Sequence, residues 1–426
     1  MIKRILKNAV VKNASWLIAG RIAQMLISLV VGLLTARYLG PSNYGLINYA
    51  NAYTAFFMAF CTLGINSVLV QEFINHPEQE GAAIGSTLVM RAISSFCSAG
   101  VIIGIVSILE KDEPTTIAVT ALCSIGLLFN IFETFNYWFQ SKLQSKVTSI
   151  VILVSYAVTA LYKIILLALN KSVLWFAFST ALDYICIGIL LIIAYKKYQG
   201  QRLSFSKDIS KRILKKSVPF ILPSLMVSIY GYADKFMLKQ MLNEESIGFY
   251  SSATAICSMW TFVLTAIIDS MYPTIMESHK TDKEMFEKRN RLLYAIVFYV
   301  SVAVSLFFTV FADKIVAVLY GQAYLPAAAP LRVVTWYTAF SYLGVARNAW
   351  IVCENKQKLL KYIYIVSALS NVVLNYFFIP SMGPTGAALA SLITQILTTL
   401  VVPLFFKDIR YNSVLMLEGI LLRKVR

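Results

Sequence analysis

Twelve apolar runs, each about as long as a membrane-spanning helix, dominate the sequence. An α-helix needs roughly 20 apolar residues to cross the hydrocarbon core of a bilayer. With 58% apolar residues, 14% charged residues and a mean hydropathy of +0.69, the chain has too few charges to cover a water-soluble surface. The runs lie at approximately 13–35, 46–70, 83–109, 115–138, 147–169, 172–195, 217–240, 246–272, 292–311, 329–352, 359–379 and 385–406. We therefore predict an all-α membrane protein with twelve transmembrane helices.

The sequence repeats itself, which divides the chain into two halves. Shifting it by 203 residues places Leu39 on Leu242 and Gly45 on Gly248. Six runs in each half is an even number, so both halves enter the membrane from the same side. We expect two parallel six-helix lobes with the substrate between them. The predicted N-terminal lobe, basic cytoplasmic connector, C-terminal lobe and cytoplasmic tail are residues 1–195, 196–216, 217–406 and 407–426.

The distribution of Lys and Arg predicts the orientation in the membrane. With the N-terminus inside, the inner segments hold 27 of these residues and the outer segments hold five. Cytoplasmic loops retain Lys and Arg, so we place both termini in the cytoplasm. The net charge of +17 then lies at the inner face and does not indicate nucleic-acid binding. We expect the first helix to be retained, because its run is of spanning length, carries Arg21 and lacks a small-residue cleavage site.

Ten charged residues remain inside the predicted helices, although each costs at least about 2.5 kcal/mol at the bilayer centre. The six cations are Arg21, Arg91, Lys163, Lys235, Arg332 and Arg347, and the four acids are Glu133, Asp183, Asp234 and Asp269. Such residues normally face a bundle interior or a water-filled cavity. The excess of cations predicts an anionic ligand.

Polar residues repeat at helical spacing on four of the predicted helices. The stripes include Arg21 with Gln24, Asn130 with Glu133, the series from Ser251 to Asp269, and Asn371 with Asn375. Four such faces predict a shared aqueous cavity. The alternative is that these side chains only join helices through hydrogen bonds.

The seventh predicted helix contains the best candidate for a hinge. Pro219 and Pro223 remove backbone hydrogen bonds, and Gly231 follows shortly before the pair Asp234 and Lys235. A helix with this pattern can bend or partly unwind, and the freed carbonyls can bind a cation or move during gating. The alternative is a static kink in which Lys235 extends toward the membrane surface.

Several segments resemble the polysaccharide flippases, the O-antigen and capsule repeat-unit translocases of the multidrug/oligosaccharidyl-lipid/polysaccharide exporter superfamily. The segments are RYLGPSNYGLINYA (37–50), ADKFMLKQML (233–242), SIGFYSSA (246–253), LYGQAYLPAAAPLRV (319–333) and NYFFIPSMGPTGAALAS (375–391). The resemblance covers essentially the whole chain. It implies two six-helix lobes around a central cavity, as in the multidrug extrusion (MATE) transporters.

The resemblance also implies a substrate, which is a polyprenyl-diphosphate-linked oligosaccharide turned across the bacterial cytoplasmic membrane. A diphosphate needs Arg or Lys donors, and a glycan needs amide, hydroxyl and aromatic groups. The expected substrate-binding residues are Arg21, Arg37, Arg91, Arg347, Lys163, Lys235, Gln24, Asn130 and Glu133. Arg37 could instead anchor the outer interface, and Arg332 is expected near the outer surface.

In lipid-flippase relatives a cation site lies in the second lobe, on the seventh, eleventh and twelfth helices. Asp234, Asn371, Asn375 and Ser391 occupy the matching positions here. Their oxygens form an acceptable shell for Na⁺, although only one of them is charged. Proton coupling through Asp234 or Glu133, downhill movement without an ion, and pairing of Asp234 with Lys235 or an arginine remain alternatives. We expect no other cofactor.

Two other functions compete with lipid-linked glycan transport. A multidrug or cation antiporter of the same superfamily should carry an excess of acids in its helices, whereas this chain carries an excess of cations. A polysaccharide polymerase or glycosyltransferase should have a larger extramembrane domain with acids, histidines or metal ligands, so we do not expect an enzyme. A polymerase and chain-length proteins are candidate partners, alongside the lipid bilayer itself.

Overall fold

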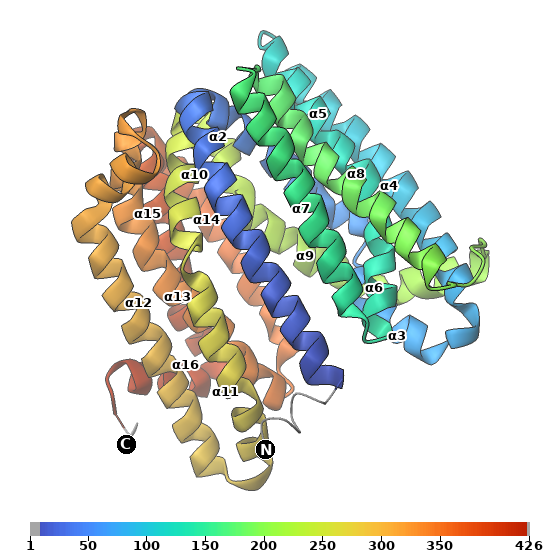
Figure 1. Ribbon diagram of the computed structural model, residues 1–426. Coiled ribbons are helices and arrows are strands. Elements are labelled where there is room, and N and C mark those ends of the chain that lie inside the picture. Colours follow the sequence, from blue (N-terminus) through green and yellow to red (C-terminus); the bar gives the residue numbers. More distant parts are fainter. Residues whose placement is uncertain (1–8, 424–426) are drawn as a thin grey trace. The chain divides into compact units, whose positions relative to one another are not determined.

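The computed structural model describes the backbone of residues 9–423. Side-chain surroundings are described from Ala23 onward, and burial is also described for Gly20. Every regular element in this part of the chain is helical (Figure 1). The first-half elements are α2 (Ala9–Thr62), α3 (Asn66–Asn75), η1 (Pro77–Gln79), α4 (Glu80–Leu109), α5 (Pro114–Asn130), η2 (Ile131–Glu133), α6 (Thr134–Ser141), α7 (Ser145–Ala168) and α8 (Val173–Lys197). The prediction of an all-α fold is confirmed.

The remaining elements begin with the long helix that carries the predicted hinge. They are α9 (Lys207–Met241), α10 (Glu244–Ser258), α11 (Thr261–Thr281), α12 (Lys283–Leu319), η3 (Gln322–Ala327), α13 (Ala328–Cys353), η4 (Gln357–Leu359), α14 (Leu360–Met382), α15 (Pro384–Ile396), η5 (Leu397–Val401), η6 (Val402–Phe405) and α16 (Lys407–Ile420). Of these, η5 is a π-helix that directly continues α15.

Ten helical stretches among the described residues are long and apolar enough to cross a membrane. One of them, Ala23–Asn75, includes parts of two predicted apolar segments, 13–35 and 46–70. The predicted run 329–352 lies on α13, which has the length but carries Arg332 and Arg347 and is not among the ten. The protein is therefore a multi-pass membrane protein.

The chain folds into two compact units. The first unit contains the chain up to Leu39 together with Leu46–Ser228, and the second contains Gly40–Gly45 together with the chain from Ile229. The boundary falls inside α9, between the two prolines and Gly231.

The segment Gly40–Gly45 belongs to the second unit because of a close backbone crossing. The helical path of α2 breaks at Gly40, whose φ of 73° and ψ of 171° suit glycine, and Pro41 follows. A Cβ at Gly45 would lie 1.9 Å from the carbonyl oxygen of Glu244, and one at Gly248 would lie 2.1 Å from that of Pro41. The two glycines that the 203-residue shift aligns therefore face the same crossing.

In the first unit, an apolar core lies where α3, α4, α6, α8 and the start of α9 meet. It includes Phe73, Phe135, Phe139 and Ile213. Beside it, buried Glu72 accepts hydrogen bonds from Arg212 Nε at 2.8 Å and Lys216 Nζ at 2.9 Å. The basic connector is thus helical from Lys207 and pairs with an acidic residue of α3.

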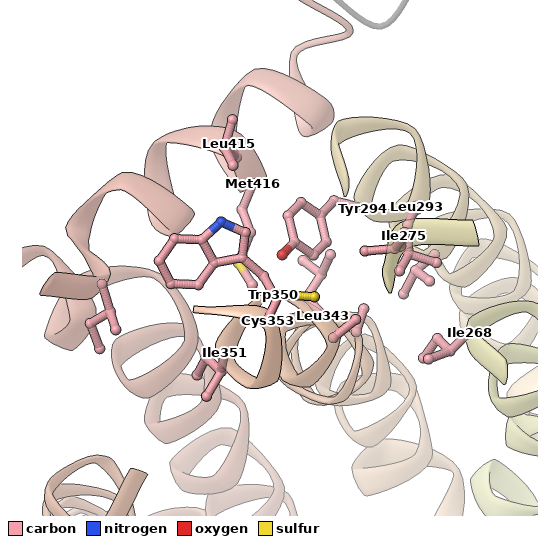
Figure 2. Packing of buried hydrophobic residues seen from close by; sticks show 14 of the residues in the cluster. Ile268, Ile275, Leu293, Tyr294, Leu343, Trp350, Ile351, Cys353, Leu415 and Met416 are labelled. Carbon is pink, nitrogen blue, oxygen red and sulfur yellow. The ribbon is translucent and has the colours of Figure 1, made fainter. Parts of the chain in front are cut away.

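The core of the second unit gathers residues from α11, α12, α13, α14 and α16 (Figure 2). Trp350 and Tyr294 lie at its centre with Leu415 and Met416. The segment 407–426 is the predicted short basic cytoplasmic tail, and within it α16 buries an apolar face in this core. The Lys and Arg residues of this segment hid the helical spacing of Ile409, Leu415 and Met416.

Candidate functional site

A fully enclosed carboxylate, Asp234 on α9, organises the first polar cluster of the second unit. Its Oδ2 accepts hydrogen bonds from Tyr250 Oη and, at 2.8 Å, from Ser391 Oγ. Its Oδ1 accepts one from Asn375 Nδ2 at 2.5 Å. The four residues lie on α9, α10, α14 and α15, so the cluster depends on the tertiary packing of four helices.

Asn371 completes the Asp234 cluster from one helical turn before Asn375. Asn375 Nδ2 also donates to Asn371 Oδ1 at 3.1 Å, and Asn371 Nδ2 donates to Ser391 Oγ at 3.2 Å. Both asparagines have 0% exposure. The i, i+4 spacing on α14 puts their amides on one face, which is the reason that they meet the same carboxylate.

The Asp234 cluster offers several oxygen atoms to a cation. Asn375 Oδ1 is buried and has no hydrogen-bond partner among the described residues, and the same holds for Thr394 Oγ1 one turn beyond Ser391. An unpartnered buried oxygen is costly unless another group pairs with it. Carboxylate, amide and hydroxyl oxygens are the donors that hard cations prefer. The donor set therefore fits Na⁺, and the carboxylate alone could carry a proton.

All four residues predicted for cation coupling meet in this cluster, and Tyr250 was missed. Tyr250 stands in SIGFYSSA, one of the segments quoted for the resemblance. Its neighbours Ser251 and Ser252 favoured reading the helix as a stripe of small hydroxyls. The presence of a tyrosine among these small residues was the sequence feature that could have identified Tyr250 as a partner of Asp234.

A second cluster in the same unit surrounds Arg347 on α13. The guanidinium is 5% exposed, and Nη1 donates to the carbonyl oxygens of Thr398 at 3.3 Å and Thr399 at 3.5 Å. Its Nε has no hydrogen-bond partner. Among the described residues, no carboxylate lies within ion-pairing distance of Arg347.

The two carbonyls that hold Arg347 are available because the helix changes its hydrogen-bonding pattern there. In the π-helix, the N–H of Val402 bonds to Leu397 O, so Thr398 O loses its usual donor. The usual donor for Thr399 O would be residue 403, which is a proline without an N–H. Arg347 takes the place of both donors.

A third cluster lies in the first unit, around Arg91 on α4. Arg91 has 0% exposure, and its Nη2 donates to Asn130 Oδ1 at 2.6 Å and to Asn130 O at 3.2 Å. Its Nη1 donates to Thr134 Oγ1 at 3.2 Å. Glu133 Oε2 lies 3.9 Å from Nη2 and accepts a bond from Asn130 Nδ2 at 3.2 Å. The cluster joins three predicted substrate-binding residues: Arg91, Asn130 and Glu133.

The remaining predicted residues are Arg21, Gln24, Arg37, Lys163 and Lys235, and Lys235 directly follows Asp234 on α9. Arg21 is on α2, but its side chain is not among those described. Gln24 on α2, Lys163 on α7 and Lys235 on α9 are half-buried, and Arg37 is exposed. Arg332 is half-buried, and its side chain pairs with Asp313 at 2.5 Å.

The hinge residues lie on a continuous helix. Helix α9 passes through Pro219 and Pro223 to Met241, and Gly231 has open space around its Cα, with no atom within 4 Å of an added Cβ. Motion at these residues stays a prediction.

Two sequence relatives match nearly the whole chain. The capsular polysaccharide biosynthesis protein CapF of Staphylococcus aureus is 23% identical over 417 residues, covering 94% of this chain and 100% of that protein. A protein named O-antigen transporter from Shigella flexneri is 20% identical over 414 residues, covering 92% and 96%.

Solved transporter structures share the fold. The lipid II flippase MurJ in an inward closed conformation has a TM-score of 0.75 at 16% identity, covering 95% of this chain and 92% of that one. An inward-facing MATE transporter of the MOP superfamily has a TM-score of 0.68 at 15% identity, covering 93% and 96%. A family model described as polysaccharide biosynthesis protein matches residues 10–279. The chain therefore belongs to the polysaccharide biosynthesis protein family.

Proposed function

We propose that the protein turns polyprenyl-diphosphate-linked oligosaccharide repeat units from the inner to the outer leaflet of the bacterial cytoplasmic membrane, for a cell-surface polysaccharide. The family and its capsule and O-antigen relatives support this class of substrate. The MATE and MurJ fold supports alternating access rather than enzymatic chemistry.

The observation that carries the proposal is the buried guanidinium of Arg347. A charge inside the membrane is retained when it has a functional role, and its partners are normally other charged or polar groups. In the described part of the chain, Arg347 donates long hydrogen bonds to two carbonyls, and its Nε has no hydrogen-bond partner. A diphosphate oxygen would supply the charge-assisted hydrogen bond that the protein does not.

The Asp234 cluster is proposed to couple transport to Na⁺ or H⁺. Binding of Na⁺ would replace hydrogen bonds to Asp234 and engage the unpartnered Asn375 oxygen. Protonation would instead neutralise the carboxylate and leave the network intact. These two modes differ in whether the oxygen of Asn375 is used.

Both termini are proposed to be cytoplasmic, together with the basic start of α9. This orientation follows from the Lys and Arg distribution and from the pairing of Arg212 and Lys216 with Glu72. A cysteine placed at Lys207 should react with an impermeant reagent only from the cytoplasm. Labelling from outside the cell would contradict the orientation. A polymerase and chain-length proteins are proposed partners at the outer face.

Transport can be tested with purified protein in proteoliposomes. Fluorescent oligosaccharide on polyprenyl diphosphate is placed in the membrane, and an impermeant glycosidase reports the fraction exposed. We expect protein-dependent movement of the diphosphate lipid and little movement of the same glycan on an uncharged polyprenyl ether. Equal movement of both lipids, or of neither, contradicts the proposed function. Efflux of cationic drugs with neither lipid moved would favour an antiporter.

A further inference from the structure

A pocket inside the first unit lies directly beside the Arg91 cluster. It is bordered by α5, η2, α6, α7 and α8, and its cavity volume is about 60 Å³, which is room for several water-sized groups. The polar and aromatic lining residues are Phe129, Asn130, Glu133, Asn136, Thr148 and Tyr184, and the rest of the wall is aliphatic.

The wall combines the two kinds of group that recognise a sugar ring. The carboxylate of Glu133, whose side chain is 37% exposed, and the amide of Asn136 can bond to hydroxyl groups. The rings of Phe129 and Tyr184 supply apolar faces for the C–H side of a pyranose. A mostly apolar pocket with a few fixed polar groups is the usual form of a specific small-ligand site.

The polar wall is held in place from behind. Arg91 donates to both oxygens of Asn130, so the Asn130 Nδ2 group is turned toward Glu133 Oε2. The short 3₁₀ segment η2 ends at Glu133 and separates α5 from α6, which sets the carboxylate on the pocket side. Interruptions of this kind in a helix often mark functional positions. Arg91 has 0% exposure, so a ligand would meet Glu133 and not Arg91.

A glycine makes room for one of the rings. A Cβ at Gly126 on α5 would lie 2.8 Å from Cδ2 of Tyr184, closer than two such atoms can approach. Glycine at this position therefore allows Tyr184 to lie against α5 while it lines the pocket.

We propose that this pocket binds one neutral sugar residue of the transported glycan, with Glu133 and Asn136 as hydrogen-bonding residues and Arg91 as a positioning residue. The proposal rests on the proposed function and adds a specificity to it. An acidic sugar would bring a second carboxylate against Glu133, so the pocket should disfavour uronic acids.

The test compares two lipids that share a polyprenyl diphosphate and carry either an N-acetylhexosamine or a uronic acid. Their movement is measured in proteoliposomes for the wild type and for Glu133→Gln. We expect the wild type to move the neutral lipid about tenfold faster, in line with the 1–3 kcal/mol typical of pocket discrimination. Glu133→Gln should reduce that preference to about threefold or less. Glu354→Gln is the matched control, because Glu354 is 36% exposed and lies in the second unit.

Further variants separate the possible failures. If Glu133→Gln does not fold, Asn136→Leu takes its place as the test. It alters the pocket without removing the bonds of Arg91, and it should slow the movement of the neutral lipid. An unchanged preference in both variants overturns the pocket proposal while the proposed function stands.

If the wild type moves neither lipid, the proposed function fails, and a thermal shift with a soluble neutral disaccharide decides the pocket. Stabilisation of the wild type that is lost in Asn136→Leu supports the pocket. No stabilisation of the wild type overturns it.

Discussion

Arg91 in the first unit and Arg347 in the second are both buried, but the two side chains have different surroundings. Arg91 in the first unit donates to three side chains and a carbonyl, and a carboxylate lies 3.9 Å away. In the second unit, the hydrogen-bond acceptors of Arg347 among the described residues are two backbone carbonyls. Among the described residues the Nε of both arginines lacks a hydrogen-bond partner, so the difference is that Arg91 has a nearby carboxylate and side-chain acceptors, which Arg347 lacks.

This difference is the basis on which we propose a positioning role for Arg91 and a diphosphate contact for Arg347. Sequence position alone treats them alike, because both stand in apolar helices and both were predicted to contact a diphosphate. The hydrogen-bond partners distinguish them: neutral and acidic side chains fix Arg91, and carbonyl dipoles leave the net charge of Arg347 uncompensated.

Replacing Arg347 should have the largest effect on transport. Loss of hydrogen bonds to a charged group costs roughly 1.5–3 kcal/mol each, so Arg347→Ala should slow movement of the diphosphate lipid by about 100-fold. Arg347→Lys keeps the charge and should recover part of the rate. Arg332→Ala on the same helix is the control, since Arg332 is 41% exposed and pairs with Asp313. Wild-type transport in Arg347→Ala would remove the contrast between the two arginines.

Replacing Arg91 should act mainly on stability. Removing one partner of a buried charged cluster costs about 3–5 kcal/mol, because Glu133 and Asn130 lose their partner. Arg91→Ala should therefore lower the midpoint of thermal unfolding in detergent much more than Arg347→Ala does. If Arg347→Ala were the less stable variant, the assignment of roles would have to be reversed.

The Asp234 cluster gives a prediction of intermediate size in the same unit as Arg347. Asn has nearly the size of Asp and can still form hydrogen bonds, but it carries no charge. Transport by Asp234→Asn should therefore lose its dependence on a Na⁺ or H⁺ gradient. Asn375→Ala distinguishes the ions: it should abolish a Na⁺ dependence but leave an H⁺ dependence in place. Transport in proteoliposomes is measured with each gradient in turn. Unchanged gradient dependence in Asp234→Asn would exclude this cluster as the coupling site.

The smallest effect is expected at Pro403. Pro403→Ala returns an N–H near Thr399 O and gives that carbonyl a helical donor, which competes with Arg347. Transport should fall by about three- to tenfold, corresponding to roughly 1 kcal/mol for one hydrogen bond. Pro380→Ala in α14 is the control for a general effect of proline loss. An equal fall in the transport rate of both variants would show that the free carbonyl of Thr399 does not determine how Arg347 acts.

Much of the fold could be predicted because an apolar run of about 20 residues identifies a membrane-spanning helix. The Asp234 cluster was also within reach, since Asn371 and Asn375 are one helical turn apart and the quoted segments carry the remaining ligands. Tyr250 was missed because its hydroxyl matters only when α10 packs against α9 and α14.

The surroundings of the two arginines could not be predicted. Pro403 is visible in the sequence, but the π-helix before it depends on the packing of the chain. Asn130 and Glu133 were recognised as a polar pair, but their spacing does not indicate that Arg91 contacts them. Helix α16 was overlooked for the opposite reason, because the flanking charges outweighed a clear amphipathic spacing.

The crossing at Gly45 and Gly248 has a consequence for how such a chain can arise. The two glycines hold equivalent places in the duplicated sequence and lie at one backbone crossing. This is the pattern of a twofold contact between identical subunits, in which one residue type serves both sides. In an ancestor of half the length, a single codon would set the whole crossing, and any bulkier residue would be placed there twice. Gene fusion makes the two sides independent, so that one can be modified while the other keeps its glycine.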